Sequence, residues 1–376
     1  MDISTFVKLG FKHTKNATAE TVYLKTGYDM TKPVTFYGLI NERCNVKCRH
    51  CEYWRLKHYE EELTIEQWQN ALLSIKAFVG TYFINFSGGE PFIKKGFLDL
   101  LGFCHQNGIR SGVTTNGSAL SRRGVEKVVA AHPFNVNISC DAPNAEVHDY
   151  FRGFPGLFDK LTQGITFLRE EQAAQGVDFP IIIKPTISSV NFRLLPELVE
   201  WTEKMGATAI NFQPLDRWTP ETYNELWIEE ESWPELEQIV ERLIQMKRAG
   251  APIMNSEEIL GLTVANFREE KAPPEVKPCL VGLRDYFIRT NGDVYLCLHY
   301  PSIGNLKEQS AHDLWYGEKA RKIRKETTEC DQLCLITCLS QKTLTDKFKM
   351  GVKLLNTKIK RVPHSSQDKK TNSVSQ

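Results

Sequence analysis

The stretch that decides the fold is residues 34–51, VTFYGLINERCNVKCRHC. Its first seven residues are apolar, aromatic or β-branched apart from one glycine, which predicts a buried β-strand over residues 34–40. Three cysteines, Cys44, Cys48 and Cys51, follow this strand directly. In parallel α/β folds, ligands and catalytic groups collect in the loops after the carboxyl ends of strands. The sequence therefore predicts a functional site at the end of its first strand.

Strands and amphipathic helices alternate from about residue 33 to residue 215. A capping box at Thr64 and Gln67 starts one helix, whose apolar face carries Ile65, Trp68 and Leu72. This alternation predicts a parallel sheet, either open and doubly wound or closed into an incomplete barrel, and the pattern leaves both open. The six predicted strands are residues 34–40, 82–86, 110–114, 134–140, 181–187 and 209–213.

The alternation of predicted strands and helices ends after residue 215. A helix is predicted from Ser232, with Pro234 in its first turn and Glu235 completing a capping box. The proline-rich stretch 271–278 predicts a domain boundary, and FIRTNGDVYLCL predicts a hairpin that turns at Asn291-Gly292. The expected units are an N-terminal extension (1–32), a main domain (33–232), a helical linker (233–274), a cysteine-rich domain (275–340), and a basic helix with a disordered tail (341–376).

Composition excludes several classes of protein. The chain has 376 residues, 41% hydrophobic content and a formal net charge of +1, so it is globular and has no bulk field for nucleic acid. No apolar stretch reaches the roughly 18 residues of a membrane span, and the N-terminus lacks the apolar core of a secretion signal. We therefore expect a cytoplasmic protein without stable membrane insertion.

Ten cysteines are many for a reducing compartment, where disulfides are rare. Cys104 and Cys140 stand alone in apolar segments and are expected to be core residues. The other eight fall into two groups, which indicates metal or cofactor ligands rather than disulfides. The groups are Cys44, Cys48 and Cys51, and Cys279, Cys297, Cys330, Cys334 and Cys338.

Three thiolates in the first group are enough to hold one face of an iron–sulfur cubane. A 4Fe-4S cluster closed by protein has four ligands, so three would leave one iron open for another molecule. A zinc site is the alternative that the spacing leaves open, with His50 or His58 as the fourth ligand.

The C-x3-C-x2-C spacing resembles the signature of the radical S-adenosylmethionine (SAM) superfamily. The resemblance implies that SAM chelates the open iron and that one electron splits it into methionine and a 5′-deoxyadenosyl radical, which takes hydrogen from substrate. It implies an external donor such as flavodoxin or ferredoxin. It also places His50, the residue before the third cysteine, near the adenine.

Further motifs resemble this family in the same order along the chain. Residues 87–91, SGGEP, are similar to the family's GGE motif, and HDYFR at 148–152 is similar to its HDxxR segment. The resemblance covers about residues 34–215 and favours a partial (β/α)6 TIM-like barrel. It implies that SAM is bound by His50, Gly88, Gly89, Glu90, Asn116, Ser139, Arg152 and Leu215.

The second cysteine group resembles the SPASM/twitch extension of radical SAM enzymes. That resemblance implies an auxiliary 4Fe-4S cluster, and five cysteines with C-x3-C-x3-C spacing favour one such cluster over two. Four ligands would close it, and the pattern does not identify the spare cysteine. A buried stripe of cysteines on one helix face, or a zinc site, remains an alternative.

The sequence is least informative about the substrate. The leading hypothesis is oxidative modification or cross-linking of a ribosomally made peptide, with any peptide-recognition domain supplied by a separate protein. A dehydrogenase, dehydratase or epimerase acting on a sugar, cyclitol or nucleoside is the second hypothesis. A non-catalytic metal-binding interaction protein is the third. No catalytic base is identified, although Asp216 and Arg217 follow the last strand.

Overall fold

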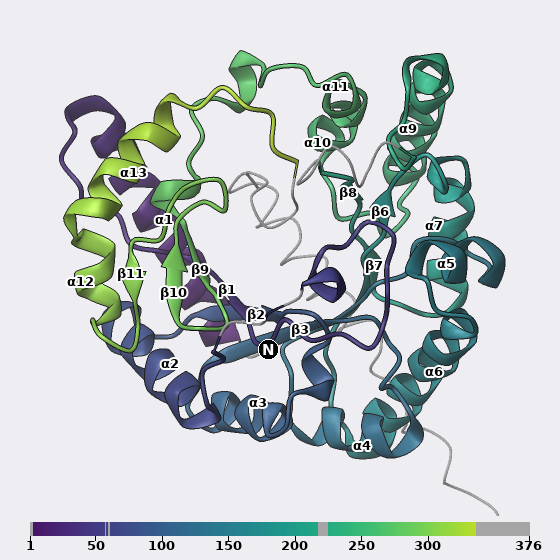
Figure 1. The fold of residues 1–376 in the computed structure, drawn as a ribbon, viewed down its shortest axis with the longest axis horizontal. Helices are drawn as coiled ribbons and strands as arrows, with labels where there is room; N and C mark the ends of the chain where they lie inside the picture. The colour runs from purple at the N-terminus through teal and green to yellow at the C-terminus, as the bar shows by residue number, and fades with distance from the viewer. Residues whose placement is uncertain (1–2, 57, 59–60, 217–224, 336–376) are drawn as a thin grey trace, which may run out of the picture.

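We describe a computed structural model of the chain, in which residues 3–56, 58, 61–216 and 225–335 are placed (Figure 1). Helices surround a curved sheet of nine strands in the order β11-β10-β9-β1-β2-β3-β4-β5-β7. All neighbouring strands from β9 to β7 run parallel, and β10 and β11 pair antiparallel. This is the predicted partial barrel.

The strands are short, and most are separated by a helix. They are β1 Thr35–Leu39, β2 Phe83–Ser87, β3 Arg110–Thr115, β4 Val136–Ile138, β5 Ile181–Ile183, β6 Thr186–Ile187, β7 Ala209–Ile210, β8 Gln213–Pro214, β9 Asp285–Ile288, β10 Asp293–Tyr295 and β11 Gly304–Asn305. The α-helices are α1 Ile3–Thr26, α2 Ile65–Val79, α3 Phe97–Gln106, α4 Arg122–Ala130, α5 Ala145–Arg152, α6 Leu157–Gln175, α7 Leu195–Lys204, α9 Trp233–Arg248, α10 Glu257–Gly261, α11 Thr263–Phe267, α12 Ala311–Tyr316 and α13 Glu318–Glu329.

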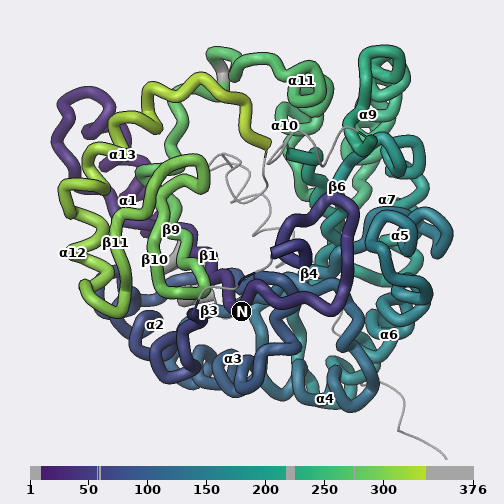
Figure 2. Tube along the Cα trace, in the orientation of Figure 1, coloured from purple at the N-terminus to yellow at the C-terminus, as the bar shows by residue number. Residues whose placement is uncertain are grey.

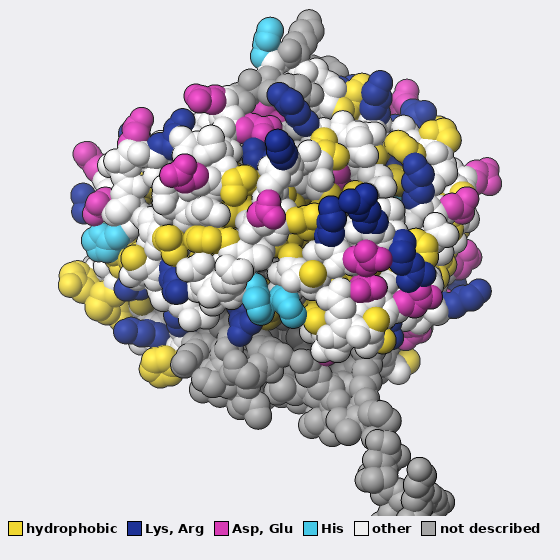
Figure 3. Space-filling view, turned by 90° about the horizontal axis from the view of Figure 1, so that it is seen from below, with side chains coloured by type: hydrophobic (Ala, Val, Ile, Leu, Met, Phe, Trp, Pro, Cys, Tyr) yellow, Lys and Arg dark blue, Asp and Glu magenta, His cyan; other side chains and the backbone are white. Residues whose placement is uncertain are grey.

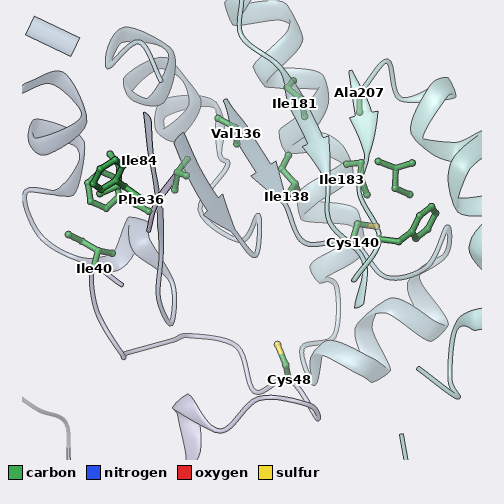
Figure 4. Close-up of a cluster of buried hydrophobic side chains, with 14 of the residues drawn as sticks. Phe36, Ile40, Cys48, Ile84, Val136, Ile138, Cys140, Ile181, Ile183 and Ala207 are labelled. Carbon is green, nitrogen blue, oxygen red and sulfur yellow. The ribbon is translucent and has the colours of Figure 1, made fainter. Parts of the chain in front are cut away.

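The outward face of the sheet is apolar and packs against the helices. Phe36, Ile84, Ile138 and Ile183 are fully buried there, and Figure 4 shows them on β1, β2, β4 and β5. Each such side chain stabilises the fold by about 1.5–3 kcal/mol through burial. Cys104 and Cys140 also lie in this core, as predicted.

The opposite face of the sheet is polar. Asn85 donates to the Thr114 hydroxyl (2.9 Å), and Asn137 donates to Asn85 (2.9 Å) and to Thr114 (3.0 Å). Asn135 continues the chain with a 2.7 Å hydrogen bond to Asn137. These side chains form a hydrogen-bonded polar network on this face of the sheet, in which the Oδ1 of Asn135 is buried without a partner.

Two predicted strands are each broken in two. Residues 181–187 form β5 and β6, and residues 209–213 form β7 and the start of β8. Pro185 cannot donate to a ladder, and the Thr186 amide donates to the Asp141 carboxylate (2.8 Å) instead of continuing β5. The displaced pieces pair with one another as a separate two-stranded sheet, β6-β8.

Of the two capping boxes predicted at helix N-termini, one is present in the structure and the other is not. The predicted capping box at Thr64 and Gln67 is present on α2. The predicted box at Ser232 is wrong: its side chain caps nothing, because the 3-10 turn Glu230–Ser232 leads straight into α9 and gives Ser232 helix-like dihedrals. The predicted helix 341–361 lies outside the described residues.

The cysteine-rich segment continues the barrel sheet. β9 lies parallel to β1, with Tyr37 opposite Phe287, and the predicted hairpin is confirmed by antiparallel pairing of β9 and β10. Gly292 adopts a φ of +94° in its turn, a conformation that favours glycine. The division of the chain at about residue 275 stays a prediction.

The N-terminal segment, for which the sequence predicted no helix, forms α1. Glu20 on α1 accepts two 2.7 Å hydrogen bonds from Arg284, which lies directly before β9. Asn16 donates to the Leu283 carbonyl (3.1 Å) and accepts from the Lys32 amide (2.8 Å). These contacts fix α1 against the strand that joins the cysteine-rich segment to the barrel.

The surface carries charges of both signs, as the composition predicts. In the view of Figure 3, basic and acidic side chains are interspersed over the surface, consistent with the net charge of +1. None of the described helices combines the length and apolarity that crossing a membrane requires.

We predict that Glu20→Gln lowers the free energy of unfolding by about 1–3 kcal/mol, because it leaves the Arg284 guanidinium with an unmatched charge next to a buried amide. Urea denaturation followed by circular dichroism measures this change. Glu235→Gln is the control, since Glu235 pairs with Arg193 in the open and should cost less than about 1 kcal/mol. Equal losses in the two variants would contradict the role assigned to Glu20.

Candidate active site at the carboxyl ends of the strands

The three cysteines of the first group lie together in the loop after β1. Each influences the others electrostatically, and Figure 4 shows Cys48 on a loop beyond the strand ends. Cys48 is buried, and Cys44 and Cys51 are half-buried. Burial raises the pKa of the Cys44 and Cys48 thiols and raises that of Cys51 to about 11. Binding of a cluster would therefore release protons from these groups.

Each of the three sulfurs has an N–H donor nearby. The Val46 amide (3.4 Å) and the Asn116 side chain (3.8 Å) donate to Cys44 Sγ. Arg152 Nη1 lies 3.7 Å from Cys48 Sγ, and the Tyr53 amide donates to Cys51. Donors of this kind stabilise thiolates and so offset part of the effect of burial, which raises the pKa of all three thiols.

The two glycines after β2 bring two loops into backbone contact. A Cβ atom on Gly88 would lie 2.4 Å from the Asn41 carbonyl oxygen, and one on Gly89 would lie 2.0 Å from that of Arg43. The Gly89 amide donates to Asn41 O (2.9 Å), and the Glu90 amide donates to Arg43 O (2.8 Å). The family resemblance implies that these two glycines bind SAM, which stays a prediction. The structure shows that they approach the cysteine loop itself.

Glu90 is fully buried behind this contact. Its carboxylate accepts from the amides of Phe92 (3.1 Å) and Asn116 (2.8 Å) and from the Thr115 hydroxyl (2.8 Å). Burial raises the pKa of Glu90 to about 7 against the effect of these three donors. Glu90 thereby links the ends of β2 and β3 and positions Asn116, which reaches Cys44.

Arg152 at the end of α5 forms a buried pair with Asp141, a residue that the sequence did not single out. Its Nε and Nη2 atoms donate to the two Asp141 oxygens at 2.5 and 3.0 Å. Burial opposes ionisation of Asp141, but Arg152 and His148 hold its pKa below the usual value. The signal was present in the sequence, since Asp141 follows the fourth strand directly. With two nitrogens on Asp141, Arg152 turns Nη1 toward Cys48.

The remaining predicted SAM contacts surround the same edge. The His50 ring stacks on Phe151 with centroids 4.6 Å apart, and burial lowers the pKa of His50 to about 3. The Ser139 amide donates to Thr115 O (2.9 Å), just beyond β4, and the Leu215 amide donates to Ile187 O (2.9 Å), just beyond β8. The structure therefore places all of these residues after strand ends.

Four cysteines of the second group come together, although they are far apart in the sequence. Cys334 is influenced electrostatically by Cys279, Cys297 and Cys330, and also by Asp216 after β8. Cys338 lies outside the described residues. In the part of the chain that is placed, no three His, Cys, Asp or Glu side chains are arranged around a single metal ion.

One pair of neighbouring strands, β1 and β9, contacts or leads into both cysteine groups. Tyr37 on β1 stacks on Phe287 of β9 with ring centroids 4.8 Å apart, and both pack with Cys279 and Cys297. β1 then leads into the loop that carries Cys44. The stacked rings of Tyr37 and Phe287 thus connect β1, which leads into the first cysteine group, with β9, which packs beside the second.

We predict that Gly89→Ala lowers the iron content after anaerobic reconstitution, because the new methyl group would displace the backbone of Arg43 next to Cys44. Iron per chain and the visible absorption of the cluster measure the effect. Gly102→Ala on α3 is the matched control, since its Cβ would meet nothing within 4 Å. Full iron content in the Gly89 variant would contradict this role for the glycine.

Comparison with known proteins agrees with this arrangement. The family model of the radical SAM superfamily matches residues 39–211, and that of the SPASM iron-sulfur cluster-binding domain matches residues 279–339. An AdoMet-dependent heme synthase from Methanosarcina barkeri is 30% identical over 302 residues, which are 75% of this chain and 81% of that protein. The sporulation killing factor maturation protein SkfB of Bacillus subtilis is 24% identical over 316 residues, 83% of this chain and 72% of that protein.

Solved structures show the same fold. Streptococcus suis SuiB bound to S-adenosylmethionine aligns with a TM-score of 0.62 at 16% identity, over 82% of this chain and 71% of that chain. A structure of anSMEcpe with bound AdoMet aligns with a TM-score of 0.61 at 15% identity, over 88% and 98%. This chain belongs to the radical SAM superfamily, and it is an enzyme that uses S-adenosylmethionine, a 4Fe-4S cluster and an iron–sulfur-binding SPASM segment.

Proposed function

We propose that this enzyme removes hydrogen from a ribosomally made peptide and so oxidises or cross-links it. The observation that carries the proposal is that both cysteine groups border one strand pair: the loop with Cys44 follows β1, and Tyr37 of β1 and Phe287 of β9 pack with Cys279 and Cys297. A substrate held between them would lose hydrogen at the first site and an electron at the second. That combination gives a net oxidation.

Cys44, Cys48 and Cys51 are the proposed ligands of the SAM-binding cluster. Their mutual proximity and their N–H donors fit three thiolates on one cubane. When bound, SAM on this cluster supplies the radical that abstracts hydrogen. The residues proposed to hold SAM are His50, Gly88, Gly89, Glu90, Asn116, Ser139, Arg152 and Leu215, all at this edge.

The chain's own residues orient that site. Glu90 fixes Asn116 through its amide, and Asp141 fixes Arg152 through two hydrogen bonds. Arg152 is proposed to meet the SAM carboxylate with its remaining nitrogen, Nη1, which lies beside Cys48. Asn116 and Arg152 are thus already held in position by their partners when no ligand is bound, which reduces the entropy lost when SAM binds.

Cys279, Cys297, Cys330 and Cys334 are the proposed ligands of one auxiliary 4Fe-4S cluster. These four already influence one another, and four thiolates close a cubane. Cys338 would then be the spare cysteine. A cluster here would accept the electron left on the substrate, and a reducing compartment such as the cytoplasm would preserve it.

The peptide hypothesis is supported by relatives whose names describe peptide chemistry. They include SkfB and a PqqA peptide cyclase from Rhodopseudomonas palustris, which is 26% identical over 162 residues. A separate peptide-recognition protein remains part of this proposal.

A second candidate substrate is a tetrapyrrole. The observation that favours it is the 30% identity to the Methanosarcina barkeri heme synthase over 81% of that protein's length.

We predict that Cys44→Ser, Cys48→Ser or Cys51→Ser abolishes formation of 5′-deoxyadenosine under strong reductant, because the SAM-binding cluster loses a ligand. Iron should be about eight per chain in the unchanged protein and fall by about half in each variant. Cys104→Ser, which alters a core cysteine, is the control and should keep both activity and iron. Zinc in place of iron would support the non-catalytic alternative.

The substrate classes are separated by anaerobic incubation with SAM, reductant and either short peptides encoded beside this gene or Fe-coproporphyrin III. We expect a peptide to lose two hydrogens or to gain an internal bond, measured by mass spectrometry. A Cys297→Ser or Cys334→Ser variant should still cleave SAM but form little product. A changed mass only in the tetrapyrrole would reject the peptide proposal and favour the second candidate.

A further inference from the structure

We propose that an exposed basic patch beside the SAM cluster loop is the docking surface for an acidic electron-donor protein of the flavodoxin or ferredoxin type. The basic patch is defined as Lys47, Arg49 and Arg55 with the rings of Trp54 and Tyr150. This inference rests on the proposed function, because the reaction needs one electron from outside the chain for each SAM that is split.

The patch concentrates positive charge in a chain whose net charge is close to zero. Residues 43–58 contain five Lys or Arg and a single acid, Glu52, whereas the whole chain carries a net charge of +1. Lys47, Arg49 and Arg55 are exposed, and Glu52 is half-buried. A local cluster of one sign attracts a partner of the opposite sign and orients it during encounter.

The cations of the patch are held in place by the two rings. Lys47 Nζ lies 5.9 Å from the centroid of Trp54, and the Arg55 guanidinium lies 4.7 Å from the same ring. The Arg49 guanidinium lies 3.9 Å from the ring of Tyr150, which is 49% exposed, and Arg49 Nε donates to the Tyr150 carbonyl (3.2 Å). Cations fixed in this way lose little freedom on binding.

The patch connects directly to a cluster ligand. The Trp54 indole donates to the carbonyl oxygen of Cys48 at 2.9 Å, and the Cys51 amide donates to the same carbonyl at 3.2 Å. A protein seated on Trp54 would therefore stand one hydrogen bond away from the backbone of a proposed cluster ligand. Short separation is what electron transfer between two proteins requires.

The patch borders the end of α5. The Arg49 amide donates to the Phe151 carbonyl (3.0 Å), and Gly153 packs against the Lys47 carbonyl, so the patch lies over the end of α5. Figure 2 shows α5 on the outside of the ring of strands.

The electron balance is simple. A flavodoxin hydroquinone becomes a semiquinone, or a reduced ferredoxin becomes oxidised, and the SAM-binding cluster gains that one electron. The same electron then enters the sulfonium when its carbon–sulfur bond breaks. The patch itself is neither oxidised nor reduced.

The test uses the cluster-loaded full chain, an acidic bacterial flavodoxin and the variant Lys47→Gln/Arg49→Gln/Arg55→Gln. We expect the Kd for flavodoxin, measured by calorimetry at low salt, to rise about tenfold or more as three attractive charges are lost. The rate at which flavodoxin hydroquinone reduces the cluster should fall in parallel. In the unchanged protein, added salt should raise the Kd, because screening weakens the attraction.

The matched control is Lys319→Gln/Lys322→Gln/Lys325→Gln on α13, which removes the same charge from exposed positions across the molecule from α5 (Figure 1). Its Kd should equal that of the unchanged chain. SAM cleavage driven by reduced methyl viologen, a small reductant that needs no docking, should be unaffected in both variants. If the patch variant loses iron, Lys47→Gln alone supplies the binding measurement.

Each other outcome has a distinct meaning. An unchanged flavodoxin Kd in the patch variant, or an equal rise in the α13 control, would overturn the docking proposal. Loss of peptide modification with methyl viologen at an unchanged flavodoxin Kd would assign the patch to peptide binding instead. Failure of the unchanged protein to cleave SAM with methyl viologen would reject the proposed function while leaving the flavodoxin Kd as a separate result.

Discussion

The close backbone contact between the loops after β1 and β2 is the constraint on which the rest of the site depends. Two hydrogen bonds, from Gly89 N to Asn41 O and from Glu90 N to Arg43 O, join these loops at 2.9 and 2.8 Å. Only glycine permits this separation, because any Cβ at Gly88 or Gly89 would overlap a carbonyl group. The contact sets the position of the cysteine loop relative to the ends of the neighbouring strands.

Two buried carboxylates extend that constraint to the sulfurs. Glu90 holds Asn116 against Cys44, and Asp141 holds Arg152 against Cys48. Both acids are fully buried and fully hydrogen-bonded, so removing a partner would leave a costly uncompensated group. Glu90 and Asp141 therefore fix the positions of the side chains next to the cysteines, and they can do so without contacting a bound ligand.

The cysteine-rich segment is integrated into the barrel through β9 rather than attached by a flexible linker. Its strand adds to β1, α1 fixes the segment before it through Glu20 and Arg284, and Tyr37 stacks on Phe287 between the two cysteine groups. Displacement of β9 would disturb both sites together.

The sequence by itself determined the α/β class, the position of the first cysteine group after a buried strand, the capping box of α2 and the hairpin at Gly292. These features are local, because the spacing of apolar residues, helix caps and turns each depend on residues close together in the sequence. Only the tertiary structure decided that Asp141 receives Arg152, that the fifth and sixth predicted strands each break in two, and that Cys279, Cys297, Cys330 and Cys334 come together. It also decided that β9 pairs with β1 and that residues 264 positions apart, Glu20 and Arg284, form an ion pair. Such contacts join residues far apart in the sequence and depend on how the sheet curves, which short sequence patterns do not predict.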